Sequence, residues 1–242
     1  MVAILRAYAC AARSLLQRAV LAHFLWPTCL SAAAWLTVGL LYWDRVARAL
    51  VGLVRDHLPL ALATRDTVLA ASLKVTLYLV SVPLALSTAL LLLELVALPF
   101  ILDRVAQTDY PQLEARHGGS QWHSLRNTLL SFAVAAVVAV VTLPLWLLPG
   151  AGAVLSLGLT SFLNYRSFRY DVLMKHADAH ELSALPAAHR GRLLLLSLGA
   201  STLTLVPGIN LVAVPFAGLA FAHYLLHALA CARQAAAGAA RS

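Results

Sequence analysis

The chain has 242 residues, of which 61% are hydrophobic and 12% are charged, and its formal net charge is +8. Soluble domains carry about 25% charged residues, so this composition excludes an ordinary soluble domain and indicates an integral membrane protein. Leu, Ala and Val dominate, which favours helices, because a helix satisfies its backbone groups within one segment. Short strands of alternating polarity, the sign of a transmembrane β-barrel, are not seen in the sequence.

Residues 3–19, "AILRAYACAARSLLQRA", predict an amphipathic helix at the membrane surface. Arg6, Arg13 and Gln17 follow one another at spacings of seven and four, so they share one stripe of the helix, with apolar residues on the remaining face. The alternative is a signal peptide. Against it, the apolar stretch continues through Trp43 without a clean small-residue stop.

Two long apolar tracts follow and predict two spanning helices. The first covers 20–43, and a polar loop is expected from there to Asp66. The second covers 67–102, which is 36 residues or about 54 Å of helix. The hydrocarbon layer is only about 30 Å thick, so this helix is expected to protrude. A second polar loop is expected over 103–127.

The rest of the chain predicts two re-entrant or partly penetrating helical hairpins with Pro-Gly tips. They cover 128–163, with Pro149 and Gly150, and 193–230, with Pro207 and Gly208. The arm 193–206 has 14 residues, only about 21 Å of helix, which is too short to span comfortably. Paired Gly/Pro-interrupted segments point to a transport site in many carriers. The alternative is pairs of ordinary spans joined by tight turns.

A charged segment, 164–192, separates the two hairpins and is expected to be a cytoplasmic loop. With the N-terminus inside, thirteen of the 18 Lys and Arg residues fall on the cytoplasmic side. The other five are Arg45, Arg48, Arg55, Arg65 and Lys74. This bias predicts cytoplasmic termini, and it explains the net charge without nucleic acid.

Neither a metal site nor a catalytic set is expected. Cys10, Cys29 and Cys231 form no spacing pattern and are interpreted as packing residues. The histidines of "KHADAHE" (175–181) do not complete an HExxH motif and suit a solvated loop. No Ser/His/Asp set, P-loop or GxGxxG occurs, so the sequence predicts a non-enzyme without cofactors.

The stretch "YRSFRYD" (165–171) interleaves arginines and aromatic residues. In a soluble chain it would suggest RNA binding. Beside an apolar arm it predicts an interfacial anchor, with the aromatic rings at headgroup depth and the arginines on lipid phosphate.

Several stretches resemble the CysZ sulfate-transporter family, which is also grouped with the etoposide-induced membrane proteins. They are "VALPFILDRV" (96–105), "FRYDVLMKH" (168–176) and "GASTLTLVPGINLVAVPFAGLAFAHYL" (199–225). "LLQRAVLAHFLWP" (15–27) also fits the family's basic helix leading into a Pro-containing first span. The resemblance covers nearly the whole chain in order.

The resemblance implies a bacterial inner-membrane protein with two long spanning helices and two hairpins that penetrate part-way, assembled as a homo-oligomer. It also implies sulfate uptake that feeds cysteine synthesis. The alternative is a scaffold or accessory membrane protein of the same family without transport of its own.

Sulfate is a dianion, and it needs Arg or Lys, hydroxyls or helix N-termini to replace its water. Arg18 matches the family's basic position before the first span and is the first candidate for anion contact, assisted by Arg13. The alternative is that both arginines snorkel to lipid headgroups. Gly208, Ile209 and Asn210 precede the last helix, and their backbone N–H groups are a second candidate set.

Three further residues are candidates for the path or for coupling. Glu94, in "LLLLELVALPF", is a carboxylate deep in a span, where ionisable groups are costly and usually functional. A structural ion pair near the interface is its alternative role. Ser201 and Thr202 offer hydroxyls to the path, or small faces for close helix packing.

Overall fold

The computed structural model describes residues 1–57, 66–206 and 209–239, and these residues form helices and turns without a strand. This confirms the all-α class. Among the described residues, four helices are long and apolar enough to cross a membrane: Val20–Leu53, Ala70–Leu92, Gln121–Val141 and Val212–Ala239. The re-entrant character of the hairpins stays a prediction. The chain divides into two compact units, Ala22–Ala97 and the rest, which are described separately.

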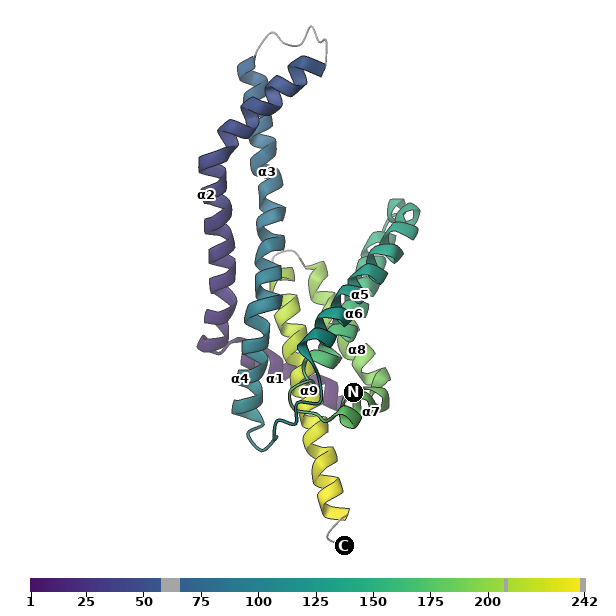
Figure 1. Cartoon of the computed structure of the whole chain (residues 1–242). Coiled ribbons are helices and arrows are strands. Elements are labelled where there is room, and N and C mark those ends of the chain that lie inside the picture. Colours follow the sequence, from purple (N-terminus) through teal and green to yellow (C-terminus); the bar gives the residue numbers. More distant parts are fainter. Residues whose placement is uncertain (58–65, 207–208, 240–242) are drawn as a thin grey trace. The chain divides into compact units, whose positions relative to one another are not determined.

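The smaller unit is an antiparallel pair of long helices, α2 (Arg18–His57) and α3 (Asp66–Leu92) (Figure 1). Hydrogen bonds join them: Ser31 Oγ donates to the Ala85 carbonyl at 2.8 Å, and Trp35 Nε1 donates to Thr88 Oγ1 at 3.2 Å. Large apolar side chains on the outer faces remain exposed, which suits helices surrounded by lipid. A π-helical turn, η1 (Leu93–Ala97), follows α3.

The polar loop predicted after residue 43 is wrong, because α2 continues to His57. Val46, Leu50 and Leu53 repeat at helical spacing between the arginines, so this segment is an amphipathic continuation of the span. The loop predicted over 103–127 is also shorter than expected, since α4 (Leu98–Asp109) extends the helical run.

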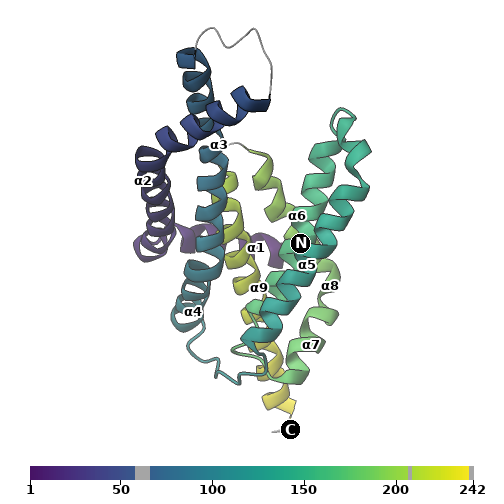
Figure 2. The same cartoon turned by 45° about the horizontal axis from the view of Figure 1, so that its top comes forward.

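The larger unit is organised around α9 (Asn210–Ala239). In α9, 72% of the most apolar 18-residue stretch is buried inside the protein, whereas the corresponding stretches of the other three candidate spans are only 6% to 18% buried. Phe221, Leu225 and Leu229 are fully buried. The helix α1 (Val2–Leu15) and α4 both pack against α9 (Figure 2). The amphipathic helix predicted at the N-terminus is therefore present.

The first hairpin consists of α5 (Gln121–Val141), a 3₁₀ turn η2 (Leu143–Leu147) and α6 (Ala151–Asp171). Its arms are antiparallel, and Asn127 Nδ2 donates to the Arg166 carbonyl at 3.0 Å. Gly150 caps α6 with φ +80°, a left-handed conformation that glycine adopts without a Cβ penalty. The Pro-Gly tip predicted here is therefore a tight turn.

The second hairpin consists of α8 (Arg190–Ser201), a 3₁₀ turn η3 (Thr202–Leu205) and α9. Its predicted tip, Pro207 and Gly208, lies outside the described residues. Two hydrogen bonds join α8 to α6. Ser197 Oγ donates to the Ser161 carbonyl at 2.6 Å, and Asn164 Nδ2 donates to Ser201 Oγ at 3.1 Å.

The loop predicted over 164–192 is largely helical. The helix α6 continues to Asp171, and α7 (Ala179–Ala188) begins with a capping box in which Asp178 and Glu181 each accept the other's backbone N–H. Glu181 also pairs with Arg233 Nη2 of α9 at 2.7 Å. The charged residues of this segment cap and anchor short helices. Their high density was therefore not a sign of a loop.

Candidate functional site

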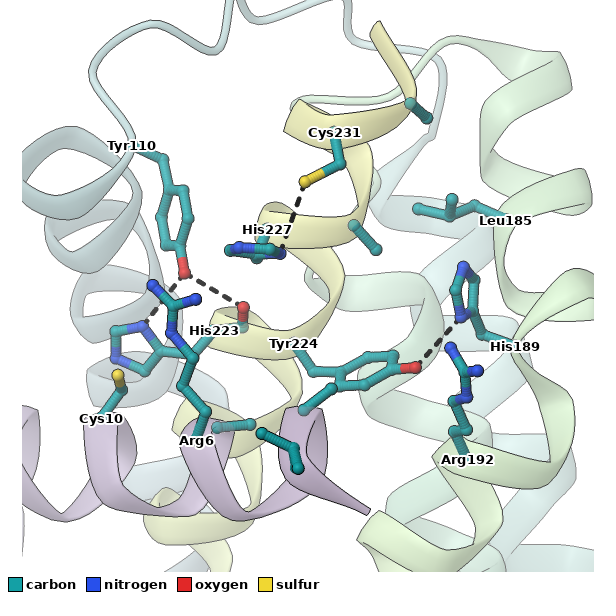
Figure 3. Close-up of a pocket in the computed structure, with 15 residues that line it drawn as sticks. Arg6, Cys10, Tyr110, Leu185, His189, Arg192, His223, Tyr224, His227 and Cys231 are labelled. Atoms are coloured by element: carbon teal, nitrogen blue, oxygen red, sulfur yellow. Dashed lines mark hydrogen bonds between the residues drawn. The ribbon is translucent and has the colours of Figure 1, made fainter. Parts of the chain in front are cut away.

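A cavity of about 670 Å³ lies in the larger unit, lined by α1, α9 and the corner between α7 and α8 (Figure 3). Its polar lining is basic. The ionisable nitrogen-bearing residues are Arg6, His189, Arg192, His223 and His227. The lining that the structure describes contains no carboxylate.

The helix α1 has a buried face and a face toward the cavity. Ile4, Ala7 and Ala11 lie on the buried face. Tyr8 ties α1 to its neighbours, because its hydroxyl donates to the Leu196 carbonyl of α8 at 2.6 Å, and its ring stacks on an α9 phenylalanine. Arg6 lies on another face and extends into the cavity beside Tyr110 and His223 (Figure 3).

The α9 wall is a stripe of polar side chains at helical spacing, His223, His227 and Cys231. His223 is buried and held from both sides. Its Nε2 lies 2.9 Å from Ser14 Oγ of α1, and its backbone carbonyl accepts from Tyr110 Oη at 3.0 Å. Burial raises the pKa of Tyr110 to about 12, so this phenol stays protonated and acts as a donor.

The opposite wall carries His189, the N-cap residue of α8, and Arg192. His189 Nδ1 lies 3.0 Å from Tyr224 Oη. Burial, and next the charge of Arg192, lower the pKa of His189, so the ring is neutral at pH 7. Arg192 is exposed and lies beside this pair (Figure 3).

These groups suit an anion. Arg6 and Arg192 form no ion pair with any residue that the structure describes, so their charge is available to a ligand. Guanidinium groups bind oxyanions strongly, through charge-assisted hydrogen bonds. The volume lies in the range of small-molecule pockets and leaves room for water around a small ion. Across the described part of the chain, no three His, Cys, Asp or Glu side chains are grouped to hold a metal.

Arg13 and Arg18 lie elsewhere, at the junction of α1 and α2. Arg13 is in the last turn of α1, and Arg18 is the first residue of α2, after a break at Leu16 and Gln17. Both side chains are exposed, and neither lines the basic cavity. Their role in anion contact stays a prediction.

The residues predicted near the second tip are only partly described. Gly208 and the side chain of Asn210, the first residue of α9, lie outside the described set. Ile209 is described, and its backbone N–H donates to the Val206 carbonyl at 3.1 Å. An anion at this N–H would therefore compete with an existing hydrogen bond.

The predicted path and coupling residues fall on three different elements. Ser201 is fully buried and accepts the hydrogen bond from Asn164. Thr202 begins the 3₁₀ turn and donates to the Gly199 carbonyl at 2.6 Å. Glu94 lies in the π-helical turn η1, and its side chain is outside the described set.

The basic cavity was not among the sites predicted from the sequence, which placed Arg6 on a surface stripe. The spacing of His223, His227 and Cys231 marks one polar face on an otherwise apolar helix, which is the signal that was available. Helix α1 covers this face because residues about two hundred positions apart in the sequence are in contact, such as Tyr8 and Leu196.

A protein-family model described as sulfate transporter CysZ/etoposide-induced protein 2.4 matches residues 7–215 of the chain. No curated protein and no solved structure matches it.

Proposed function

Because the chain belongs to the sulfate transporter CysZ/etoposide-induced protein 2.4 family, we propose that it carries a small anion across the membrane and that the anion is sulfate. The observation that supports this proposal best is the basic cavity. Two guanidinium groups that form no ion pair with a described residue face a volume whose described lining holds no carboxylate. The acid beside it, Asp109, lies 3.9 Å from His223 Nε2. The two guanidinium charges attract a dianion to the cavity.

The anion-contact residues predicted from the sequence would act at two places. Arg13 and Arg18 attract the anion at the α1–α2 junction, as Arg18's match to the family's basic position suggests. The backbone of Gly208, Ile209 and Asn210 offers a second contact at the tip of the second hairpin.

Three other side chains complete the proposed path. Ser201 and Thr202 supply hydroxyls along it. Glu94 carries the coupling proton or balances a positive charge.

We also propose a bacterial inner membrane as the location and a multi-pass homo-oligomer as the assembly. The excess of Lys and Arg on one side supports cytoplasmic termini. The imported sulfate would supply cysteine synthesis. No nucleic acid or bound cofactor takes part.

The test is uptake of labelled sulfate by liposomes that contain the purified full chain. Arg6→Gln and Arg192→Gln each remove one guanidinium from the cavity. A hydrogen bond to a charged group contributes about 1.5–3 kcal/mol, so each variant is expected to lower sulfate affinity by roughly tenfold or more. Arg104→Gln is the matched control, because Arg104 is an exposed α4 residue that does not line the cavity.

Two results would overturn the proposal. Uptake no greater than in empty liposomes, with protein that remains folded, would favour a scaffold or accessory role. Equal effects of Arg6→Gln and Arg104→Gln would show that general surface charge, and not the cavity, attracts the anion.

A further inference from the structure

A second pocket, of about 610 Å³, lies in the larger unit between α6, α7 and the start of α8. Three arginines line it: Arg166 and Arg169 of α6, and Arg190, the first residue of α8. Apolar residues, among them Phe162 and Leu194, form much of the remaining wall, together with two tyrosines and Ser183. We propose that this pocket binds an anionic phospholipid, with the phosphate held by the three arginines and an acyl chain against the apolar wall.

The pocket is arranged along the depth of the membrane. Arg166 Nη2 donates to Asn127 Oδ1 of α5 at 3.2 Å, which places Arg166 where the polar start of the candidate span Gln121–Val141 gives way to its apolar run. Phe162 is one turn from Arg166 toward the tip of the first hairpin. Leu194 is one turn from Arg190 toward the tip of the second. The charged end of the pocket is therefore at headgroup level, and the apolar end points into the hydrocarbon layer.

The three positive charges of this pocket are not neutralised by the protein. Its lining, as far as the structure describes it, holds no carboxylate. The neighbouring acids are engaged elsewhere, since Asp171 accepts from Ser124 Oγ and Glu181 pairs with Arg233. The Arg190 side chain forms no hydrogen bond or ion pair with a described residue.

The arginines of α6 are held in place by contacts that leave most of their donors free. The Arg166 guanidinium lies 5.8 Å from the centre of the Phe162 ring, and that of Arg169 lies 4.9 Å from the Tyr165 ring. Each guanidinium has five N–H donors. Arg169 Nη1 donates to Tyr165 Oη at 3.2 Å. Arg166 Nε is buried and has no partner among the described residues, so a phosphate would contact Arg166 through its Nη groups. Prearranged arginines of this kind suit a phosphate that accepts several hydrogen bonds.

The apolar wall favours a lipid over a free anion. Basic pockets between helices at the cytoplasmic side of a membrane bind acidic lipid headgroups. Leu194 is 41% exposed and is available to an acyl chain, whereas a soluble phosphate would gain nothing from it. This inference does not depend on anion transport through the other cavity.

The experiment measures binding of phosphatidylglycerol to the full chain in a zwitterionic detergent by native mass spectrometry, with phosphatidylcholine as the neutral lipid. The wild type is expected to retain phosphatidylglycerol and not phosphatidylcholine. Arg190→Gln removes one charge without breaking an internal contact and should weaken retention about fivefold, since each arginine near an acidic headgroup contributes about 1 kcal/mol. Arg190→Lys should keep most of the affinity. Arg104→Gln, an exposed residue outside the pocket, should bind as the wild type does.

Leu194→Asn and competition with soluble glycerol phosphate separate a lipid from a free anion. For a lipid site, Leu194→Asn weakens phosphatidylglycerol binding, and millimolar glycerol phosphate does not displace the lipid. Full displacement by glycerol phosphate with no effect of Leu194→Asn would overturn the proposal in favour of a soluble phosphate. Equal losses in Arg190→Gln and Arg104→Gln would also overturn it, since retention would then reflect overall charge.

Discussion

Arg233 of α9 anchors α7, and its replacement by Gln should destabilise the protein measurably. Its guanidinium donates to both carboxylate oxygens of Glu181, at 2.9 and 2.7 Å. It also donates to the carbonyls of Glu114, at 3.2 Å, and His176, at 2.7 Å. Glu181 in turn completes the capping box of α7. Because α7 contributes residues to both cavities, this one side chain supports both proposed sites.

The magnitude follows from the effect on Glu181. Arg233 is the main cause that lowers the pKa of Glu181 from its ordinary 4.5 to about 2, against the opposing effect of burial and with smaller help from the Asp178 backbone N–H and Arg116. At 1.36 kcal/mol per pKa unit this difference corresponds to roughly 3 kcal/mol. The Arg233 and Glu181 side chains are 17% and 20% exposed, so solvent screening reduces the contribution to about 2 kcal/mol. The two carbonyls that lose their donor add to the cost of Arg233→Gln.

The effect has a defined pH dependence. The folded-state pKa of Glu181 is below its ordinary value, so the contribution of the pair is complete above about pH 4.5 and is lost as the pH falls toward 2. Thermal unfolding in detergent should show Arg233→Gln about 4–8 °C below the wild type at pH 7, at about 2–4 °C per kcal/mol for a chain of this size. The difference should shrink at pH 3. Arg104→Gln serves as the control and should unfold with the wild type.

Two outcomes would refute this reasoning. One is an Arg233→Gln variant that unfolds within about 1 °C of the wild type at pH 7. The other is a double variant with Glu181→Gln whose loss equals the sum of the two single losses, because independent effects would mean that the two side chains do not interact.

Two further predictions concern close packing and a buried carboxylate. Gly199→Ala should lower the free energy of unfolding by about 1–3 kcal/mol, because the added Cβ would lie 2.3 Å from Tyr8 Oη. Gly191→Ala is the control on the same helix, since its added Cβ meets nothing within 4 Å. Equal unfolding temperatures of the two variants would contradict the contact. Burial raises the pKa of Asp171 from 3.8 to about 6, so wild-type stability should fall as the pH rises through this interval. Asp171→Asn keeps an acceptor for Ser124 and should remove this pH dependence of stability. The variant should unfold at a higher temperature than the wild type at pH 7.5 but not at pH 4. If the pH dependence persists in the variant, another group causes it.

The sequence predicted those features that depend on local pattern. Apolar length indicated the spans, and Pro149 and Gly150 indicated the turn between α5 and α6, because only nearby residues decide such elements. The helical content of 164–192 was missed, although Asp178 and Glu181 at capping-box spacing were a local signal for α7.

The basic cavity could not be predicted in the same way. It exists because Tyr8 and Ser14 of α1 bind Leu196 and His223 far along the chain. Such pairings depend on the complementarity of whole helix faces, which no single window of sequence contains. The charge of Arg6 was visible in the sequence, but its neighbours were not.

The arm α8 of the second hairpin is short, and hydroxyl residues gather at its end. At about 1.5 Å per residue, the 21 residues of α5 cover about 31 Å, whereas the 12 residues of α8 cover only about 18 Å. The end of α8 therefore falls short of the length that α5 covers, and carbonyls of its last turn accept the Thr202 backbone N–H. Thr202 donates to the Gly199 carbonyl at 2.6 Å, and Thr204 donates to the Ser201 carbonyl at 2.7 Å.

These hydroxyls thus add hydrogen bonds to carbonyls at the end of α8, while Ser201 Oγ accepts from Asn164 and fixes that end against the first hairpin. An anion passing Ser201 and Thr202 would have to compete with these bonds. Uncommitted donors, by contrast, are found on Arg6 and Arg192. A transport role for the second hairpin therefore requires the end of α8 to rearrange during the cycle, whereas the basic cavity can accept an anion as it stands.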